Sequence, residues 1–250
     1  MIRIAQWNIH GGFQISDGET QKDVKFFIDK IKELNPDILL VQEGHISKDY
    51  SQVELLSNEL NLPYYESVNL GESHLEDDSQ LCLFVLSKHE ITQHDFFEVT
   101  NPKLVSFNEK YGGEIKTEIF KKGFLSTRIR INKEFFNVIS GHGHPFHIFE
   151  DSLENHPKLI NEIQDYITKK SKDSKMILGC DLNCENIPKL FTKVFDNNIK
   201  LAFKKNTIYR KKQLDYIFLT DNFEVKDYKI DICTENHGLT YVDIEDTKSN

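Results

Sequence analysis

Short apolar runs typical of β-strands recur along the whole chain. The first is IRIAQWNI, and seven others follow in the order DILLVQE, LCLFVLS, FLSTRIRI, FFNVIS, MILG, LDYIFLT and GLTYVDI. Several are apolar at successive positions, as expected for strands covered on both faces, whereas FLSTRIRI alternates and is expected nearer a sheet edge. Asn132 and Lys133 separate two of the runs and predict a tight hairpin.

Helical spacing of apolar residues predicts four helices among these strands. In the segment from Gln21 to Asn35, apolar residues stand at positions 24, 27, 28, 31 and 34, and Pro36 ends the pattern. The other helices are expected at Ser51 to Leu60, Leu153 to Lys170 and Pro188 to Asn197. One helix between the first two strands, followed by a majority of strands, predicts two packed sheets with helices outside.

Length and composition favour one folded unit. The 250 residues are 38% hydrophobic, which is enough for a substantial core, and no repeat, low-complexity tract or Pro/Gly/Ser-rich linker divides them. We therefore expect residues 1–250 to form a single domain. With 31 basic and 40 acidic residues the net charge is −9, which argues against a surface that is basic throughout but leaves room for a local basic groove.

The cysteines and the N-terminus predict a cytoplasmic protein. The four cysteines, Cys82, Cys180, Cys184 and Cys233, form no paired CxxC pattern and are typical of reduced thiols. Cys180 and Cys184 are close enough in sequence to suggest zinc, but no second pair matches them. No stretch reaches the roughly 18 to 20 apolar residues of a membrane span, and no signal peptide is recognisable at Met1.

Polar residues that can bind a metal ion or transfer a proton gather at the ends of the predicted strands. The set consists of Asn8, His10, Gln42, Glu43, His142, His144, Asp181, Asn183, Asp215, Asn236 and His237. Strand ends can converge on one rim of a sheet sandwich, and hydrolysis of a phosphoester needs such convergence. Oxygen donors such as Glu43 and Asn8 suit Mg²⁺, an Asp can orient and deprotonate water, and a His held by a carboxylate keeps one tautomer.

Six motifs together resemble a known superfamily. WNIHGG, PDILLVQE, NVISGHGH, ILGCDLN, LDYIF and ENHGL occur in the order and approximate spacing of the endonuclease/exonuclease/phosphatase superfamily, across residues 2–244. This superfamily includes apurinic endonucleases, DNase I-like nucleases, inositol polyphosphate 5-phosphatases, neutral sphingomyelinases and tyrosyl-DNA phosphodiesterases. The resemblance implies a DNase I-like α/β (α+β) fold, in which two packed mixed sheets and flanking helices form a four-layer sandwich with the site at the shared rim.

The same resemblance implies a role for each strand-end residue. Glu43 looks like the principal ligand of Mg²⁺, or of Mn²⁺ as a substitute, with Asn8 as its supporting contact. Asp181 would align the attacking water, and Asn183 would bind the phosphoryl group.

The histidines and one further carboxylate complete the implied site. His237, paired with Asp215, would act as a base or a transition-state stabiliser. His142 falls where the family has a phosphate-contacting histidine. His10 would either face the substrate or serve as a hydrogen-bonded structural residue.

Two positions depart from the family pattern. The family usually has Ser-Asp-His where this chain has Glu235-Asn236-His237, so an amide replaces a carboxylate near the metal and should weaken metal binding. Glu235 is a poor substitute in an extended segment, because neighbouring side chains point to opposite faces. Cys180 stands where a glycine commonly precedes the aspartate, and its side chain is expected to narrow the pocket.

A basic segment adjoins the Asp215 strand. Residues 204–212, KKNTIYRKK, carry five positive charges. Tyr209 could stack on a base and Arg210 could contact phosphate, although a solvated loop that balances the acidic surface is an equal alternative.

These features predict a Mg²⁺-dependent phosphoesterase, and most directly a phosphodiesterase or nuclease acting on nucleic acid or nucleotides. One alternative is a phosphatase or phospholipase-type enzyme acting on inositol phosphates or sphingomyelin. Another is a binding module on the same scaffold whose catalysis is weakened, with Asn236 as the indication. The choice of substrate depends on loops around residues 67–80, 100–123 and 144–152, and neither it nor the oligomeric state can be read from the sequence.

Overall fold

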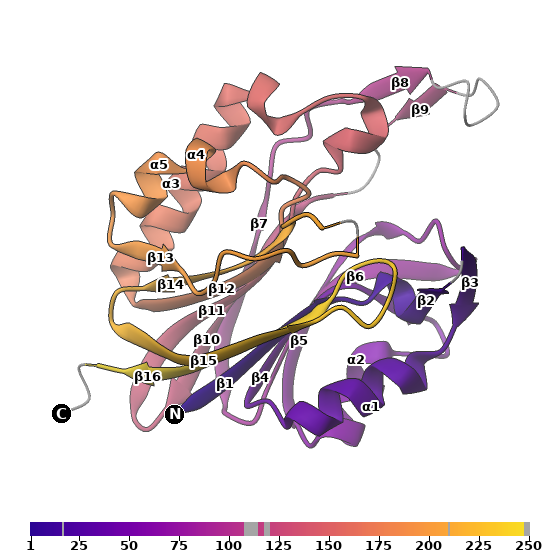
Figure 1. Ribbon diagram of the computed structural model, residues 1–250. Coiled ribbons are helices and arrows are strands. Elements are labelled where there is room, and N and C mark those ends of the chain that lie inside the picture. The colour runs from indigo at the N-terminus through magenta and orange to yellow at the C-terminus, as the bar shows by residue number, and fades with distance from the viewer. Residues whose placement is uncertain (17, 108–114, 118–120, 210, 248–250) are drawn as a thin grey trace.

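Two six-stranded sheets pack face to face in the computed structural model, which describes residues 1–16, 18–107, 115–117, 121–209 and 211–247 (Figure 1). Sheet 1 contains, in spatial order, β15 (Phe223–Asp231), β16 (Leu239–Asp246), β1 (Ile2–Asn8), β4 (Ile38–Ser47), β6 (Ser79–Ser87) and β5 (Tyr64–Glu72). Sheet 2 contains β13 (Ile199–Leu201), β14 (Asp215–Thr220), β12 (Lys175–Asp181), β11 (Glu134–His142), β10 (Gly123–Ile131) and β7 (Ile91–Glu98).

Each sheet is mixed, as predicted. β1 runs parallel to β4 in sheet 1, and β11 runs parallel to β12 in sheet 2, while the other neighbours are antiparallel. Parallel neighbours end at the same edge, so the motifs that follow these four strands lie at one rim. The predicted hairpin between β10 and β11 is confirmed, with Asn132 and Lys133 at φ 49° and 71°.

Alternation of side chains along the strands builds the layers. In β12, Ile177 packs between the sheets and Leu178 packs under the outer helices. In β1, Ile4 faces the other sheet while Trp7 faces the helices of its own side. Gly179 permits the close approach of the two sheets, because an added Cβ would lie 2.6 Å from Leu40 Cδ1.

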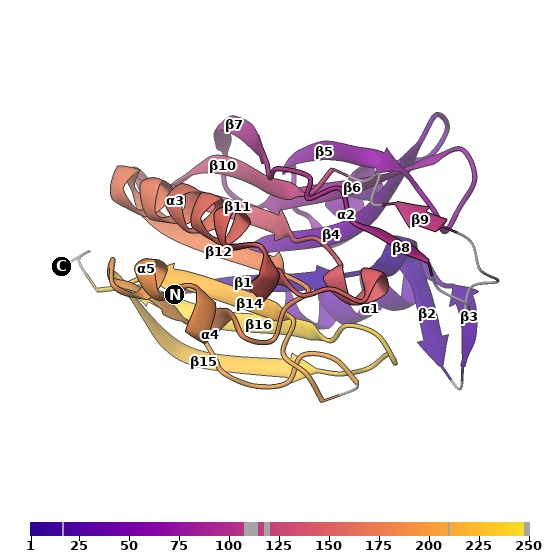
Figure 2. The ribbon, with the colours of Figure 1, turned by 90° about the horizontal axis from the view of Figure 1, so that it is seen from above.

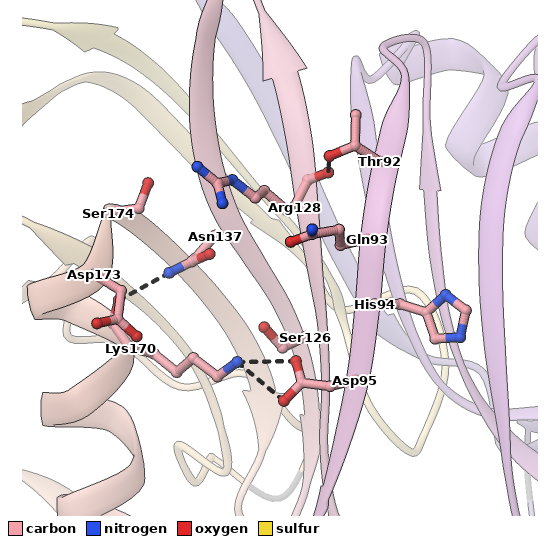
Figure 3. Close-up of a pocket in the computed structure, with 10 residues that line it drawn as sticks. All are labelled: Thr92, Gln93, His94, Asp95, Ser126, Arg128, Asn137, Lys170, Asp173 and Ser174. Atoms are coloured by element: carbon pink, nitrogen blue, oxygen red, sulfur yellow. Dashed lines mark hydrogen bonds and ion pairs between the residues drawn. The ribbon is translucent and has the colours of Figure 1, made fainter.

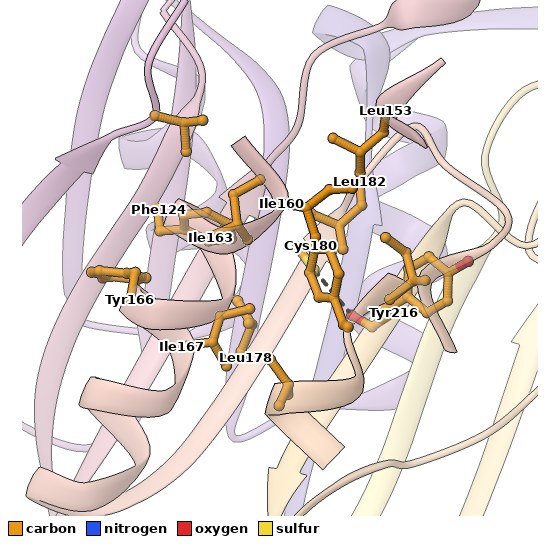
Figure 4. Packing of buried hydrophobic residues seen from close by; sticks show 14 of the residues in the cluster. Phe124, Leu153, Ile160, Ile163, Tyr166, Ile167, Leu178, Cys180, Leu182 and Tyr216 are labelled. Carbon is orange, nitrogen blue, oxygen red and sulfur yellow. Dashed lines mark hydrogen bonds between the residues drawn. The ribbon is translucent and has the colours of Figure 1, made fainter. Parts of the chain in front are cut away.

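Helices cover the outer face of each sheet, so the predicted four-layer sandwich is confirmed (Figures 1 and 2). α1 (Val24–Leu34) and α2 (Gln52–Leu60) pack on sheet 1, and α3 (Pro157–Asp173) packs on sheet 2 together with α4 (Ile187–Leu190) and α5 (Thr192–Phe195). Figure 4 shows Ile163 of α3 beside Phe124 of β10 and Ile167 beside Leu178 of β12, in the outer core of sheet 2.

Three helix boundaries differ from those predicted. α1 begins at Val24, because the Asp23 side chain accepts a hydrogen bond from the backbone N–H of Phe26 and caps the helix. α3 begins at Pro157, which suits a first helical turn, and Leu153–Asn155 forms a separate 3₁₀ turn. The expected helix at residues 188–197 is two short helices, α4 and α5.

Four strands were not predicted, and they are the edge strands of the two sheets: β5, β7, β13 and β15. Two small ribbons were also missed, β2 (Phe13–Ser16) with β3 (Glu19–Lys22) and β8 (Val105–Phe107) with β9 (Ile115–Thr117). Among the described residues, no helix is both long and apolar enough to span a membrane.

Candidate active site

Three ionisable side chains form one row across sheet 2. His142 ends β11, Asp181 ends β12, and Asp215 begins the antiparallel β14; the strand register pairs the first with the second and the second with the third. All three are buried. Cys180, one residue earlier, points to the opposite face, where its Sγ lies 3.8 Å from the Tyr216 carbonyl oxygen. It therefore packs in the outer core and does not narrow the pocket.

His237 is held against this row by Asp215. The ring Nδ1 of His237 lies 3.0 and 3.1 Å from the two carboxylate oxygens of Asp215, and its Nε2 lies 3.5 Å from Asp181 Oδ2. The backbone of His237 is fixed as well, because Trp7 Nε1 donates to its carbonyl oxygen at 2.9 Å. Trp7 is thus a core residue that supports the site.

The end of β1 contributes Asn8, which joins the two sheets at the rim. Asn8 Nδ2 donates to Asp181 Oδ2 at 3.0 Å, and Asn8 Oδ1 accepts from the backbone N–H of His10 at 3.0 Å. The His10 ring Nδ1 in turn lies 3.1 Å from Glu43 Oε2. A continuous chain of contacts therefore connects Glu43 of sheet 1 with Asp181 of sheet 2.

A β-bulge in β4 directs Glu43 toward the site. The pairing of β4 with β6 shifts between Val41 and Gly44, and Glu43 adopts φ 55°, which is unusual for a residue with a side chain. Gly44 is required beside the bulge, since an added Cβ would lie 2.0 Å from Phe84 Cε2. Glu43 Oε1 then lies 3.5 Å from His142 Nε2, which is 3.8 Å from Asp181 Oδ2.

The electrostatic surroundings keep Glu43 ionised. Burial would raise its pKa, but the hydrogen bond from His10 and the nearby positive charge of Lys122 hold this pKa well below its ordinary value. Burial, reinforced by Lys122, lowers the pKa of His142 well below 6.5, so this ring is neutral at pH 7.

Asp181 and His237 are shifted in a way that suits proton transfer. Burial, reinforced by the charge of Asp215, raises the pKa of Asp181 to about 6 despite the opposing charge of His237. Burial lowers the pKa of His237, but the carboxylates of Asp215 and Asp181 outweigh it and raise this pKa to about 10. Near neutral pH the site therefore contains a weakly basic carboxylate next to an imidazolium.

A cavity of about 660 Å³ opens onto these groups. Its lining includes the predicted residues His10, Glu43, His142, Asp181, Asn183, Tyr209, Asn236 and His237. Asn8 and Asp215 lie behind them through the contacts given above. Arg210, also predicted to bind substrate, lies outside the described residues.

Sequence reasoning missed Lys122, His74 and Gln6. Lys122 is 5% exposed, and its Nζ lies 3.4 and 3.5 Å from the two ring nitrogens of His142. His74 reaches the same cavity from the loop between β5 and β6. Gln6 is fully buried, and its Nε2 donates to Asp215 Oδ1 at 3.3 Å. The available signal for Lys122 was its position directly before β10. The start of an antiparallel strand lies at the same rim as the end of its neighbour.

A second cavity, of about 650 Å³, lies beside β7, β10 and the C-terminal end of α3 (Figure 3). Lys170 Nζ there contacts Asp95 at 2.9 Å, and Asn137 Nδ2 donates to the Lys170 carbonyl oxygen at 2.9 Å. The side chains of His94 and Asp95 are 55% and 58% exposed. These contacts join α3 to the sheet, and the exposed groups lack the desolvation that tunes catalytic residues, so the first cavity is the better candidate for an active site.

One group of residues lies close enough together to hold a metal ion. Among the described residues, one ligand atom from each of Asp181, Asp215 and His237 lies within 4.8 Å of the others. The Asp215 oxygens already accept from His237 and Gln6, and the Asp181 oxygens accept from Asn8 and Asn183. Glu43 lines the same cavity, and carboxylate oxygens are the ligands that a hard divalent cation prefers.

Solved structures share this fold over nearly the whole chain. An endonuclease/exonuclease/phosphatase from Beutenbergia cavernae has a TM-score of 0.73 at 15% identity and covers 98% of this chain and 71% of its own. A family protein from Leptotrichia buccalis gives 0.69 at 18%, covering 98% and 100%. The human nocturnin catalytic domain with bound sulfate gives 0.66 at 17%, covering 98% and 93%. No family model and no curated protein sequence matches the chain.

These comparisons identify the fold. The chain has the DNase I-like sandwich of the endonuclease/exonuclease/phosphatase proteins, as its six motifs predicted.

Proposed function

We propose that the protein is a Mg²⁺-dependent phosphodiesterase that hydrolyses nucleic-acid or nucleotide phosphodiester bonds. The observation that carries the proposal is the row of His142, Asp181 and Asp215 across sheet 2, completed by His237 and Glu43 at one cavity. A structurally similar 3′ phosphatase from Neisseria is bound to a product DNA hairpin, which supports a nucleic-acid substrate.

Asp181 serves as the general base in the proposed reaction. With a pKa of about 6 its carboxylate is mostly ionised at neutral pH, yet basic enough to take a proton from water. The hydrogen bonds from Asn8 Nδ2 and from the backbone N–H of Asn183 fix its two oxygens. A water between this carboxylate and the phosphorus would be aligned for attack.

His237 serves as a hydrogen-bond donor to the phosphoryl oxygens. Asp215 occupies its Nδ1, so the Nε2–H faces the cavity, and the pKa of about 10 keeps the ring protonated. Asn183 and Lys122, which line the cavity, would contact the remaining phosphoryl oxygens. Mg²⁺ held by Glu43 and Asn8 would supply Lewis-acid stabilisation of the same negative charge.

The proposal predicts metal-dependent cleavage of a simple diester. Bis(p-nitrophenyl) phosphate should be hydrolysed with Mg²⁺ or Mn²⁺ and spared with excess chelator, as measured by release of p-nitrophenolate. Asp181→Ala and His237→Ala preparations exclude a contaminating nuclease if they are inactive. Turnover that persists in chelator, or in both variants, would contradict the proposed site.

A phosphomonoesterase is the second candidate, because a mannosyl-6-phosphatase from Bacteroides thetaiotaomicron shares the fold. Comparing p-nitrophenyl phosphate with the bis ester distinguishes the two activities. A binding module would bind the diester without turning it over.

Asn236→Asp is expected to lower the Mg²⁺ concentration for half-maximal activity, because a second carboxylate would then line the same cavity as Glu43. Titration of activity with Mg²⁺, and of Mg²⁺ binding by calorimetry, measures the change. Asn198→Asp is the matched control, because it adds the same charge just before β13, beside the end of β14 that is farther from the cavity. An unchanged or higher Mg²⁺ requirement would count against a role for residue 236 near the metal.

A further inference from the structure

The cavity lining is chemically divided. Acids, amides, histidines and one lysine make up the polar part of the lining, and the remaining residues are apolar or aromatic. Ile15 of β2 and Leu81 of β6 belong to this second group, and its other six members come from the segments 145–149 and 208–214. We call these six the apolar lining: Pro145, Ile148, Phe149, Ile208, Tyr209 and Leu214. The reacting phosphate needs only the polar part, so the apolar lining is available to the group that the phosphate esterifies.

Part of the apolar lining is paired through its backbone with the segment that carries His237. Ile208 forms an isolated β-bridge with His237, and the backbone N–H of Tyr209 donates to the Asn236 carbonyl oxygen at 3.3 Å. Thr207, next in the segment, accepts from the backbone N–H of Asp215 at 3.1 Å. A group that contacts this lining therefore lies beside a segment whose backbone is paired with that of His237 and Asn236.

The charges of the lining disfavour a substrate with several phosphates. Among the described lining residues Lys122 is the only Lys or Arg, and three carboxylates, Glu43, Asp181 and Glu235, line the same cavity. An inositol polyphosphate would bring two or more further dianionic groups into this space, where Lys122 and the protonated His237 already face the reacting phosphate. The substrate part inside the cavity should carry one phosphoryl group and an uncharged remainder.

The segment that carries Tyr209 favours a polyanion outside the cavity. Lys204, Lys205, Lys211 and Lys212 are exposed on the segment that carries Tyr209, and the Tyr209 side chain is itself 61% exposed. An aromatic ring flanked by exposed lysines suits a nucleic-acid strand, through stacking on a base and contacts with phosphates. A lipid tail would gain nothing from these charges.

We infer that the apolar lining is a subsite for one unpaired nucleoside, so that the enzyme acts on strand ends, single strands or free nucleotides instead of paired duplex positions. The inference rests on the proposed function. A volume of about 660 Å³ matches a pocket that buries a single small ligand, and a paired base would have to be extruded from its duplex to enter.

Two diesters with the same leaving group test the subsite. Thymidine 5′-(p-nitrophenyl phosphate) and ethyl p-nitrophenyl phosphate both release p-nitrophenolate, so they differ only in the group offered to the lining. The thymidine ester should have a kcat/KM at least about fivefold higher, the lower end expected for one stacked base. Tyr209→Ala and Ile148→Ala should reduce this ratio, whereas Tyr64→Ala, at an exposed ring on β5, should leave it unchanged.

The outcomes separate the subsite from the activity. Equal kcat/KM for the two esters, or a ratio insensitive to Tyr209→Ala, would overturn the subsite while the phosphodiesterase stands. If neither ester reacts, the proposed function fails. Calorimetry with thymidine 5′-monophosphate then tests the subsite by itself. Binding that Tyr209→Ala weakens supports the subsite, and absence of binding overturns it. Stronger binding of inositol 1,4,5-trisphosphate than of thymidine 5′-monophosphate would also overturn it.

Discussion

Asp181→Asn is expected to lower kcat for bis(p-nitrophenyl) phosphate by about 10²- to 10⁴-fold, the range that a general base supplies. Asp181 is the carboxylate whose buried position beside Asp215 raises its pKa to about 6, and an amide cannot accept the proton of the attacking water. The shape of the side chain is retained, so substrate binding should change much less than kcat. Steady-state kinetics at saturating Mg²⁺ measure kcat and KM.

The same variant should remove the acid limb of the pH profile. Wild-type kcat should fall as the pH drops through about 6, because protonation of Asp181 removes the base. Asp221→Asn, at an exposed turn at the far end of β14, is the matched control and should retain the wild-type rate and acid limb. A rate for Asp181→Asn within threefold of wild type would show that another group deprotonates the water.

The central strands could be predicted from sequence, whereas the edge strands could not. Each central strand is covered on both faces, so it is apolar at nearly every position, as in β12 and β14. The edge strands carry polar residues and contain irregularities that interrupt the period of two. In β15 the pairing shifts between Val225 and Asp227, and in β5 it shifts between Asn69 and Gly71.

The site could be predicted as a set of residues but not as an arrangement. Parallel strands that end at one rim explain why Asn8, His142 and Asp181 were found from their positions alone. The direction of Glu43 depends on a bulge and a positive φ, which apolar patterning does not reveal. Lys122 was missed because it precedes the run FLSTRIRI, and a lysine outside an apolar run gives no sign of burial.

The ionisation of His237 also depends on contacts that sequence spacing cannot show. Asp215 and His237 are 22 residues apart, yet the carboxylate lies 3.0 Å from the ring and counteracts the lowering of its pKa by burial. The sequence left open whether His237 is a base or a stabiliser. A pKa raised to about 10 favours the protonated stabiliser.

Asp215→Asn tests this role and should move the alkaline limb of the kcat profile to lower pH. In the wild type, activity should persist until His237 loses its proton near pH 10. The neutral amide removes the largest influence that raises this pKa, while burial continues to lower it, so His237 should deprotonate at a lower pH. We also expect kcat at neutral pH to fall by about 10²- to 10⁴-fold, as when the orienting carboxylate of a catalytic histidine is removed.

The measurement is kcat across both limbs, from below the Asp181 pKa of about 6 to above the His237 pKa of about 10. Asp221→Asn again provides the control. If His237 acted as a general base, its neutral form would be the active one. The activity of Asp215→Asn would then rise with pH as His237 deprotonates, whereas the donor role predicts that it falls. Because the pKa of His237 falls in either case, the sign of the limb distinguishes the roles: kcat falls with pH across it for a donor and rises for a base. The size of the loss in kcat does not distinguish them.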